Sequence, residues 1–76
     1  MKEKVIALLE DIIPGFDADD EKLYDGGTLT SLNVLQLIAS IDDELDLQVP
    51  PAKIRPEYFN SVAGIVRLVE ELEDEQ

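Results

Sequence analysis

The sequence of 76 residues contains neither cysteine nor histidine. Without cysteine the chain can form no disulfide framework, and it offers no thiol nucleophile. Without histidine it lacks the commonest metal ligand and the usual base at neutral pH. Nor does any apolar run approach the roughly 20 residues that a membrane-spanning helix needs. We therefore expect no membrane insertion and few routes to enzymatic chemistry.

Basic residues are also scarce, since 6 Lys and Arg stand against 18 Asp and Glu, and the formal net charge is -12. Such a surface repels nucleic acid and anionic membranes, so neither is expected as a partner. It favours basic partners and fast, salt-sensitive encounters. The acidity could equally serve only to keep a small domain in solution. An apolar content of 45% nevertheless rules out a simple acidic disordered tail.

The length fits one small domain, residues 1–76. A chain this short buries only about 60% of the surface that its unfolded form exposes, so a deep enzyme pocket is not expected. The first segment, MKEKVIALLEDII, has two lysines and then apolar residues, but Glu10 and Asp11 interrupt it and it lacks a small-residue cleavage site. This pattern is typical of an amphipathic helix and not of a signal peptide. We expect a soluble, cytoplasmic monomer.

Apolar residues recur at helical spacing in three long segments, and proline opens a fourth, short one. The predicted helices cover Lys2–Ile13, Ser31–Leu45, Pro56–Phe59 and Val62–Glu73. Pro14 and Gly15 end the first helix, because proline cannot continue the hydrogen-bond ladder and glycine relieves the turn. Ser61 is expected to cap the last helix. The predicted fold class is all-α, a small four-helix bundle with three main helices and one short helix.

Two segments join these helices. Residues 14–30 form a long loop, of a length that is unusual in a compact domain and often functional. Its apolar residues are expected to fold back onto the core: Phe16, Leu23, Tyr24 and Leu29. The segment VPP, residues 49–51, is expected to break the chain after the second helix.

Two groups of residues suggest chemical roles that the sequence does not support. The acidic stretch DADDE, residues 17–21, would need glycine at the sixth position and glutamate at the twelfth of an EF-hand loop, and these positions hold Lys22 and Thr28. Ser31 as a catalytic nucleophile would need a base and an orienting third group, and no carboxylate or lysine has a suggestive spacing. We therefore expect a solvated acidic loop, no metal site and no enzymatic activity.

Ser31 stands where the loop becomes a helix, and two interpretations of it remain open. In the first, Thr30 caps the helix and Ser31 is an ordinary first-turn residue. In the second, the hydroxyl faces solvent beside the positive end of the helix dipole, where a phosphodiester would be stabilised by roughly 0.3–1 kcal/mol and would meet free N–H donors. A prosthetic group joined through phosphate would also bring in the thiol that the chain lacks.

The stretch YDGGTLTSLNVLQLIASIDDELDLQVP, residues 24–50, resembles the centre of the acyl carrier protein family, whose members depend on phosphopantetheine. The shared pattern is a glycine-bearing loop, a serine–leucine pair, an amphipathic acidic helix and then a β-branched residue with proline. The spacing from Asp25 and Gly27 to Ser31 is most similar to the D-alanyl carrier branch. The ungapped run VPPAKIRPEYFNSVAGIVRLVEEL, residues 49–72, points to the same branch.

The resemblance implies that Ser31 is the attachment point of covalent 4'-phosphopantetheine. It implies that Leu32 is an exposed apolar contact for partner enzymes and that the second helix is the recognition helix. The family holds an acyl or aminoacyl group as a thioester, here with D-alanine as the best single candidate, and does not itself catalyse a reaction. The implied partners are a phosphopantetheinyl transferase, an acyl- or aminoacyl-activating ligase such as a D-alanine ligase, and acceptor or synthase enzymes.

The sequence departs from the family at three neutral positions beside the serine. Thr30 replaces the usual aspartate, and Asn33 and Gln36 stand where many relatives are acidic. One explanation is a functional carrier with a specialised partner set. The alternative is an unmodified, carrier-like acidic interaction module that binds a basic partner through the second helix. The residues predicted to bind partners are Thr30, Leu32, Asn33, Gln36, Asp42, Asp43 and Glu44.

Overall fold

The structure is a computed structural model that describes residues 1–75. Within that range it contains four α-helices, one 3-10 turn and no strand. The helices are α1 (Lys2–Ile12), α2 (Ser31–Leu45), α3 (Pro56–Phe59) and α4 (Val62–Asp74), and the 3-10 turn is η1 (Pro51–Lys53). The predicted all-α class, with three main helices and one short helix, is confirmed.

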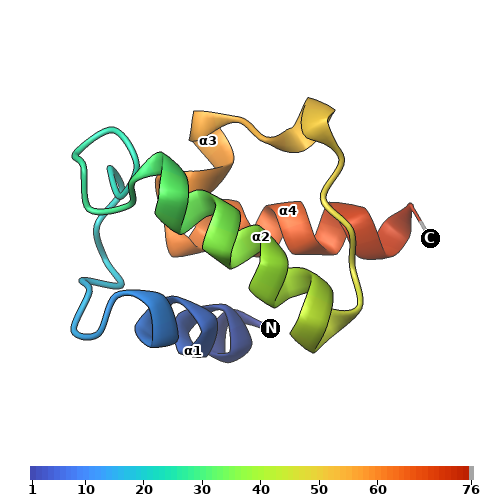
Figure 1. The fold of residues 1–76 in the computed structure, drawn as a ribbon, viewed down its shortest axis with the longest axis horizontal. Coiled ribbons are helices and arrows are strands. Elements are labelled where there is room, and N and C mark those ends of the chain that lie inside the picture. Colours follow the sequence, from blue (N-terminus) through green and yellow to red (C-terminus); the bar gives the residue numbers. More distant parts are fainter. Residues whose placement is uncertain (76) are drawn as a thin grey trace.

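The three long helices enclose a single apolar core. Helix α1 packs against both α2 and α4, while α3 packs on α4 (Figure 1). The predicted stripe of α2 is present, with Val34, Leu37 and Ile41 buried and Ile38 and Leu45 half-buried. The rest of the buried core is Val5, Leu8, Leu9, Leu23, Leu29, Leu47, Tyr58, Phe59, Val62, Ile65, Leu68, Val69 and Leu72.

The helix bounds differ from the prediction by one residue at two ends. Helix α1 ends at Ile12 and not at Ile13, which adopts φ -132° and ψ 85°. The cause is Pro14, because the residue before a proline is pushed out of the helical region. Helix α4 runs to Asp74 and not to Glu73, since the hydrogen-bond ladder continues to Glu75.

The segment VPP does more than break the chain. Pro51 opens the 3-10 turn η1, which was not predicted. Proline fits the first position of such a turn because its fixed φ is already helical and its missing N–H would be unbonded there. The turn carries Lys53 toward α4, where it forms ion pairs described below.

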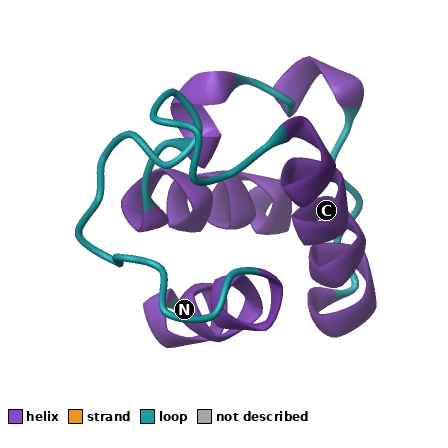
Figure 2. Cartoon of the chain, turned by 60° about the vertical axis from the view of Figure 1, so that its left-hand side comes forward, coloured by secondary structure: helices purple, strands orange, loops and turns teal. Residues whose placement is uncertain are grey.

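The long loop folds back onto the core as predicted, through Leu23 and Leu29 (Figure 2). Phe16 and Tyr24 are half-buried against the same core. Gly26 packs so closely that a Cβ there would lie 2.6 Å from the carbonyl oxygen of Lys22. Gly27 adopts a φ of +88°, which favours glycine. The loop is therefore an ordered lead-in to α2.

None of the helices described over residues 1–75 is both long and apolar enough to cross a bilayer.

In the acidic stretch, residues 17–21, carboxylates of Asp17 and Asp20 accept hydrogen bonds from the N–H groups of Asp19 (2.9 Å) and Lys22 (2.8 Å). Residues 1–75 hold no cluster of acidic side chains placed to bind a metal ion. These short-range bonds shape the turn itself.

Candidate functional site

Helix α2 starts at Ser31 because Thr30 and Asn33 cap it. The Thr30 Oγ1 accepts a hydrogen bond from the N–H of Asn33 (3.2 Å), and the Asn33 Oδ1 accepts one from the N–H of Thr30 (3.0 Å). This reciprocal capping box satisfies two N–H groups that the helix itself leaves unbonded. The cap predicted at Thr30 is therefore present, with asparagine at the third helical position, where glutamate or glutamine is usual.

The three neutral departures from the family pattern form one hydrogen-bonded chain. The Thr30 hydroxyl donates to the Asn33 Oδ1 at 3.0 Å, and the Asn33 Nδ2 donates to the Gln36 Oε1 at 3.0 Å. These side chains follow each other along one face of α2. From Ser31 to Ile41 the helix contains no charged residue, although the protein carries a net charge of -12.

Ser31 is the first residue of α2, and its side chain is exposed. None of the bonds that form the cap uses its hydroxyl, because Thr30 and Asn33 supply both side-chain acceptors. The cap also leaves the N–H groups of Ser31 and Leu32 without a side-chain acceptor at the positive end of the helix dipole. An anionic group on the Ser31 oxygen would lie at this positive end, which favours negative charge, so the local environment fits a phosphodiester.

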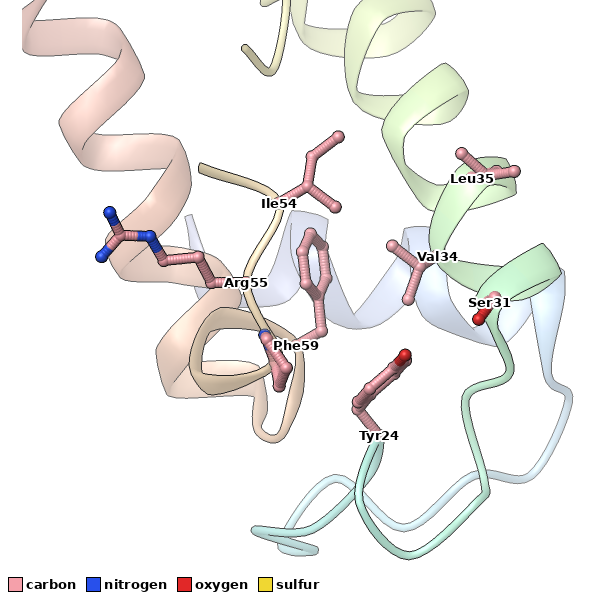
Figure 3. A pocket seen from close by; sticks show the side chains of 8 residues that line it. Tyr24, Ser31, Val34, Leu35, Ile54, Arg55 and Phe59 are labelled. Carbon is pink, nitrogen blue, oxygen red and sulfur yellow. The ribbon is translucent and has the colours of Figure 1, made fainter. Parts of the chain in front are cut away.

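An apolar cleft of about 210 Å³ opens beside Ser31. We call it the Ser31 cleft, and its lining residues are Tyr24, Ser31, Val34, Leu35, Ile54, Arg55, Pro56 and Phe59. Figure 3 shows Tyr24 and Phe59 approaching Val34 from the loop and from α3, while the Arg55 guanidinium points away. The Arg55 Nε donates to the carbonyl of Ala52 (3.0 Å). The cleft can therefore take an apolar group next to the serine.

Exposed apolar side chains gather around the mouth of this cleft. Leu32 is 64% exposed, Leu35 59% and Ile54 42%. Single exposed leucines are common, but Leu35 and Ile54 both line the cleft and Leu32 follows Ser31 in the chain, an arrangement typical of protein contact surfaces. The exposure of Leu32 agrees with the partner contact that the sequence suggested.

The acidic residues predicted to bind partners lie at the other end of α2. Asp42, Asp43 and Glu44 are exposed, at roughly 16 Å or more from Ser31 along the helix axis. Asp46 follows them as the C-cap in the left-handed conformation, with φ 56° and ψ 43°. No basic residue occupies the last turn, so these charges oppose the helix dipole. They form a separate acidic surface and do not touch the neutral cap.

The wall of the cleft opposite α2 is held to α4 by a charged cluster. The Lys53 Nζ lies 3.0 Å from a Glu71 oxygen and 2.7 Å from a Glu75 oxygen, and the Tyr58 hydroxyl donates to Glu71. The Arg67 guanidinium lies 5.1 Å from the centre of the Tyr58 ring. The Tyr58 hydroxyl, followed by Lys53, lowers the pKa of Glu71, and the same bond raises the pKa of Tyr58. This cluster fixes η1 and α3, which carry the chain on either side of Ile54.

Sequence reasoning missed the residues that complete the site from outside α2. Ile54, Pro56 and Phe59 come from the segment around α3, and only the packing of α3 on α4 brings them to Val34. Tyr24 packs against the core as expected, and it also lines the cleft, which was not predicted. Their apolar side chains gave no signal that distinguishes a cleft wall from ordinary core.

A helical bundle with an exposed serine beside an apolar cleft, at the capped start of a helix whose other end is acidic, has the features of a carrier protein. No family model matches the sequence. The chain is 33% identical to the D-alanyl carrier protein of Streptococcus uberis over 79 residues, covering 97% of this chain and 96% of the relative. It is 31% identical to that of Streptococcus sanguinis, covering 95% and 94%. To that of Streptococcus pyogenes serotype M5 it is 37% identical over 54 residues, covering 71% and 68%.

The chain therefore belongs to the acyl carrier protein family, in its D-alanyl carrier protein branch. Members of this family are carriers and not enzymes, and phosphopantetheine is their general prosthetic group. Their role implies partner enzymes that load and unload them.

Proposed function

We propose that the protein carries D-alanine as a thioester on 4'-phosphopantetheine attached to Ser31 and delivers it between partner enzymes. The relatives named D-alanyl carrier protein, similar over nearly the whole chain, support the cargo. The observation that carries the attachment site is the exposed Ser31 hydroxyl at the first position of α2, left unused by the cap.

When bound, phosphopantetheine supplies a terminal thiol on a flexible arm, which can hold an acyl group as a thioester. Ser31 contributes the oxygen of the phosphodiester, and its exposure lets a transferase reach that oxygen and remove its proton. The N–H groups of Ser31 and Leu32 and the helix dipole stabilise the phosphate by roughly 0.3–1 kcal/mol. Leu35 and Ile54 offer exposed apolar surface in the cleft beside the attachment point.

We further propose that the protein acts in the cytoplasm as a monomer formed by one domain, residues 1–76. Its partners are a phosphopantetheinyl transferase, a D-alanine-activating ligase and an acceptor enzyme. Leu32 and Leu35 give these partners an apolar contact near Ser31, and Asp42, Asp43 and Glu44 attract basic residues. Thr30, Asn33 and Gln36 supply neutral hydrogen-bonding groups near Ser31.

A second candidate function rests on the neutral chain from Thr30 to Gln36. Aspartate usually precedes the modified serine in this family, where it helps the transferase and its magnesium-bound coenzyme A. Without that carboxylate, the protein could be an unmodified module that binds a basic partner through α2. The relatives named D-alanyl carrier protein, which match nearly the whole chain, do not favour this alternative.

Loading followed by intact-mass measurement separates the two functions. We expect the native protein, incubated with coenzyme A, Mg²⁺ and a broad-specificity transferase, to gain the mass of phosphopantetheine. Ser31→Ala should gain nothing, and Ser40→Ala, which changes the other serine of α2, should load like the native chain. Loading of Ser31→Ala would refute the site. A native protein that stays unloaded while Thr30→Asp loads would support the unmodified module.

The cargo is tested on the loaded protein. A D-alanine-activating ligase with ATP should add D-alanine in preference to L-alanine, as read by the second mass increment. Equal use of both enantiomers, or of neither, would refute D-alanine as the specific cargo while leaving Ser31 as the attachment site.

A further inference from the structure

Asn60, at the junction of α3 and α4, is bonded to the loop that leads into α2. Its Oδ1 accepts hydrogen bonds from the N–H groups of Tyr24 (3.1 Å) and Asp25 (2.8 Å). Its Nδ2 donates to an Asp25 carboxylate oxygen at 3.0 Å. Its carbonyl oxygen accepts the N–H of Leu23 at 2.8 Å. One residue thus makes four hydrogen bonds to a segment some 35 positions away in the sequence.

The segment that Asn60 holds is connected to Ser31 through an internally bonded turn. The Leu29 N–H donates to the Leu23 carbonyl at 2.7 Å, and the Gly27 N–H donates to the Tyr24 carbonyl at 3.1 Å. Leu23 and Leu29 are both buried, so this turn has little freedom to shift against the core. Thr30, the N-cap of α2, directly follows Leu29. The position of residues 23–25 therefore fixes the place in the fold of the first turn of α2, which begins at Ser31.

Asn60 also links two walls of the Ser31 cleft. Tyr24 lines the cleft from the loop, and its N–H is bonded to the Asn60 side chain. Phe59 lines it from α3 and directly precedes Asn60 in the chain. Figure 3 shows Tyr24 and Phe59 in the lining of the cleft together with Ser31. Loss of the Asn60 amide would remove three of the four hydrogen bonds between Asn60 and the loop and leave only the bond from the Leu23 N–H to the Asn60 carbonyl.

We propose that Asn60 is a positioning residue for the modification of Ser31, because its side-chain amide locks residues 23–25 and so fixes the start of α2 and the cleft beside it. This role rests on the proposed attachment of phosphopantetheine to Ser31. Asn60 does not touch the reacting atoms. It reduces the set of orientations from which the hydroxyl meets the transferase, and its loss should lower kcat more than it raises KM.

Two variants test the donor and acceptor pattern of the Asn60 amide. Asn60→Asp keeps an acceptor for the Tyr24 and Asp25 N–H groups, but it loses the donor to Asp25 and places two carboxylates together. Adding Asp25→Asn exchanges the two side chains, so that an amide at position 25 donates to a carboxylate at position 60. We expect Asn60→Asp to lower kcat for loading with coenzyme A and a broad-specificity transferase by about tenfold, which corresponds to the loss of one hydrogen bond to a charged group. The double variant should recover most of the native kcat.

Amide hydrogen exchange separates positioning from overall stability. Exchange in Asn60→Asp should accelerate at residues 23–25 and at Thr30–Leu32, with α4 unchanged, and the double variant should reverse this. Ser61→Ala is the matched control, because it removes the α4 cap bond to Gly64 (3.0 Å) without touching residues 23–25. It should accelerate exchange at the start of α4 and leave the loading kcat of the folded protein unchanged.

The outcomes distinguish this proposal from the function on which it rests. A native protein that takes up no phosphopantetheine refutes the attachment, and the positioning role with it. Native loading together with a native kcat in Asn60→Asp overturns only the positioning role. Unchanged exchange at residues 23–25 in Asn60→Asp overturns the lock itself. Should Asn60→Asp fail to fold, the double variant decides, since a folded double variant with a tenfold lower kcat contradicts the proposal.

Discussion

The two ends of α2 differ in almost every physical respect. At its start, Thr30, Asn33 and Gln36 form a neutral, hydrogen-bonded cap beside Ser31 and the exposed Leu32. At its end, Asp42, Asp43, Glu44 and Asp46 crowd negative charge onto the last turn, where it opposes the dipole. The first end is capped by neutral side chains, and the second end carries charge that the helix dipole disfavours.

This difference suggests a division of roles along one helix. The dipole and the free N–H groups at the start of α2 favour the proposed phosphodiester on Ser31. Because the start is neutral, no fixed negative charge lies beside that phosphodiester. An acidic end, roughly 16 Å or more away, can attract a basic partner without repelling that phosphate at short range. Local violations of this kind often accompany function. The predictions that follow test whether the two ends act separately.

The largest effect is expected from reversing charge at the acidic end. The pair Asp42→Lys with Asp43→Lys should slow loading of D-alanine by the activating ligase about tenfold at low salt, because steering by opposite charge is lost. The difference should shrink as salt is added. The control pair Glu73→Lys with Asp74→Lys makes the same change in net charge at the end of α4. If both pairs slow loading equally, the total charge matters and the end of α2 has no special role.

The neutral end is tested by removing its cap. Thr30→Ala deletes the acceptor for the Asn33 N–H and should cost about 1 kcal/mol of unfolding free energy. In a domain of this size that corresponds to a melting temperature lower by about 4–8 °C. Thermal denaturation followed by circular dichroism measures it, with Thr28→Ala in the preceding loop as the control. A melting temperature of Thr30→Ala equal to that of the control would mean that the capping box contributes nothing.

Relieving the strain at the acidic end should stabilise the protein. Asp46 has a φ of 56°, and Asp46→Gly both removes a charge opposed to the dipole and suits that backbone. We expect a gain of about 0.5–1 kcal/mol in urea denaturation. Asp46→Asn removes only the charge, so it should gain less. Equal gains would assign the whole effect to charge, and a loss in both would show that the Asp46 carboxylate stabilises the fold.

The sequence predicted α2 well because its signals are local. Thr30 before an apolar periodic run marks the start, and the helix runs from Ser31 to Leu45 as expected. The same periodicity placed Val34, Leu37 and Ile41 in the core. The helices α1 and α4 each bury a wide face, which includes Leu8 in α1 and Leu68 in α4. A helix packed against two neighbours buries a wider face than a single stripe.

The features that depend on packing between distant segments could not be predicted. The Ser31 cleft needs Ile54 and Phe59 to meet Val34 across the bundle, and no spacing in the sequence encodes that contact. The hydrogen bonds of Asn60 could not be predicted, because a single polar residue between two helices has many possible partners in the sequence. The hydrogen bonds among Thr30, Asn33 and Gln36 follow from helical spacing, yet the sequence showed them only as missing charges.

The carboxylate of Glu71 on α4 sharpens the contrast with the acidic end of α2, because cations surround it. Tyr58 donates a hydrogen bond to it, Lys53 lies 3.0 Å away and Arg67 3.7 Å, so the pKa of Glu71 is lowered. A carboxyl group with a lowered pKa stabilises the fold above its ordinary value of 4.5, and this contribution is lost as the pH falls through the folded pKa. Tyr58 and Lys53 have raised pKa values, so their contributions are lost only at strongly alkaline pH.

Glu71→Gln should therefore lower the unfolding free energy at neutral pH, and its difference from the native protein should shrink on acidification below the ordinary pKa of the carboxyl group. Urea denaturation across that pH range measures the difference. Glu70→Gln, an exposed neighbour on the same helix, is the matched control. This effect is expected to be the smallest of the four, because solvent screens the partly exposed ion pairs of Glu71. A difference that stays constant with pH would mean that Glu71 acts through packing. The contrast between Glu71, which is paired with cations, and the unpaired carboxylates at the end of α2 would then not hold.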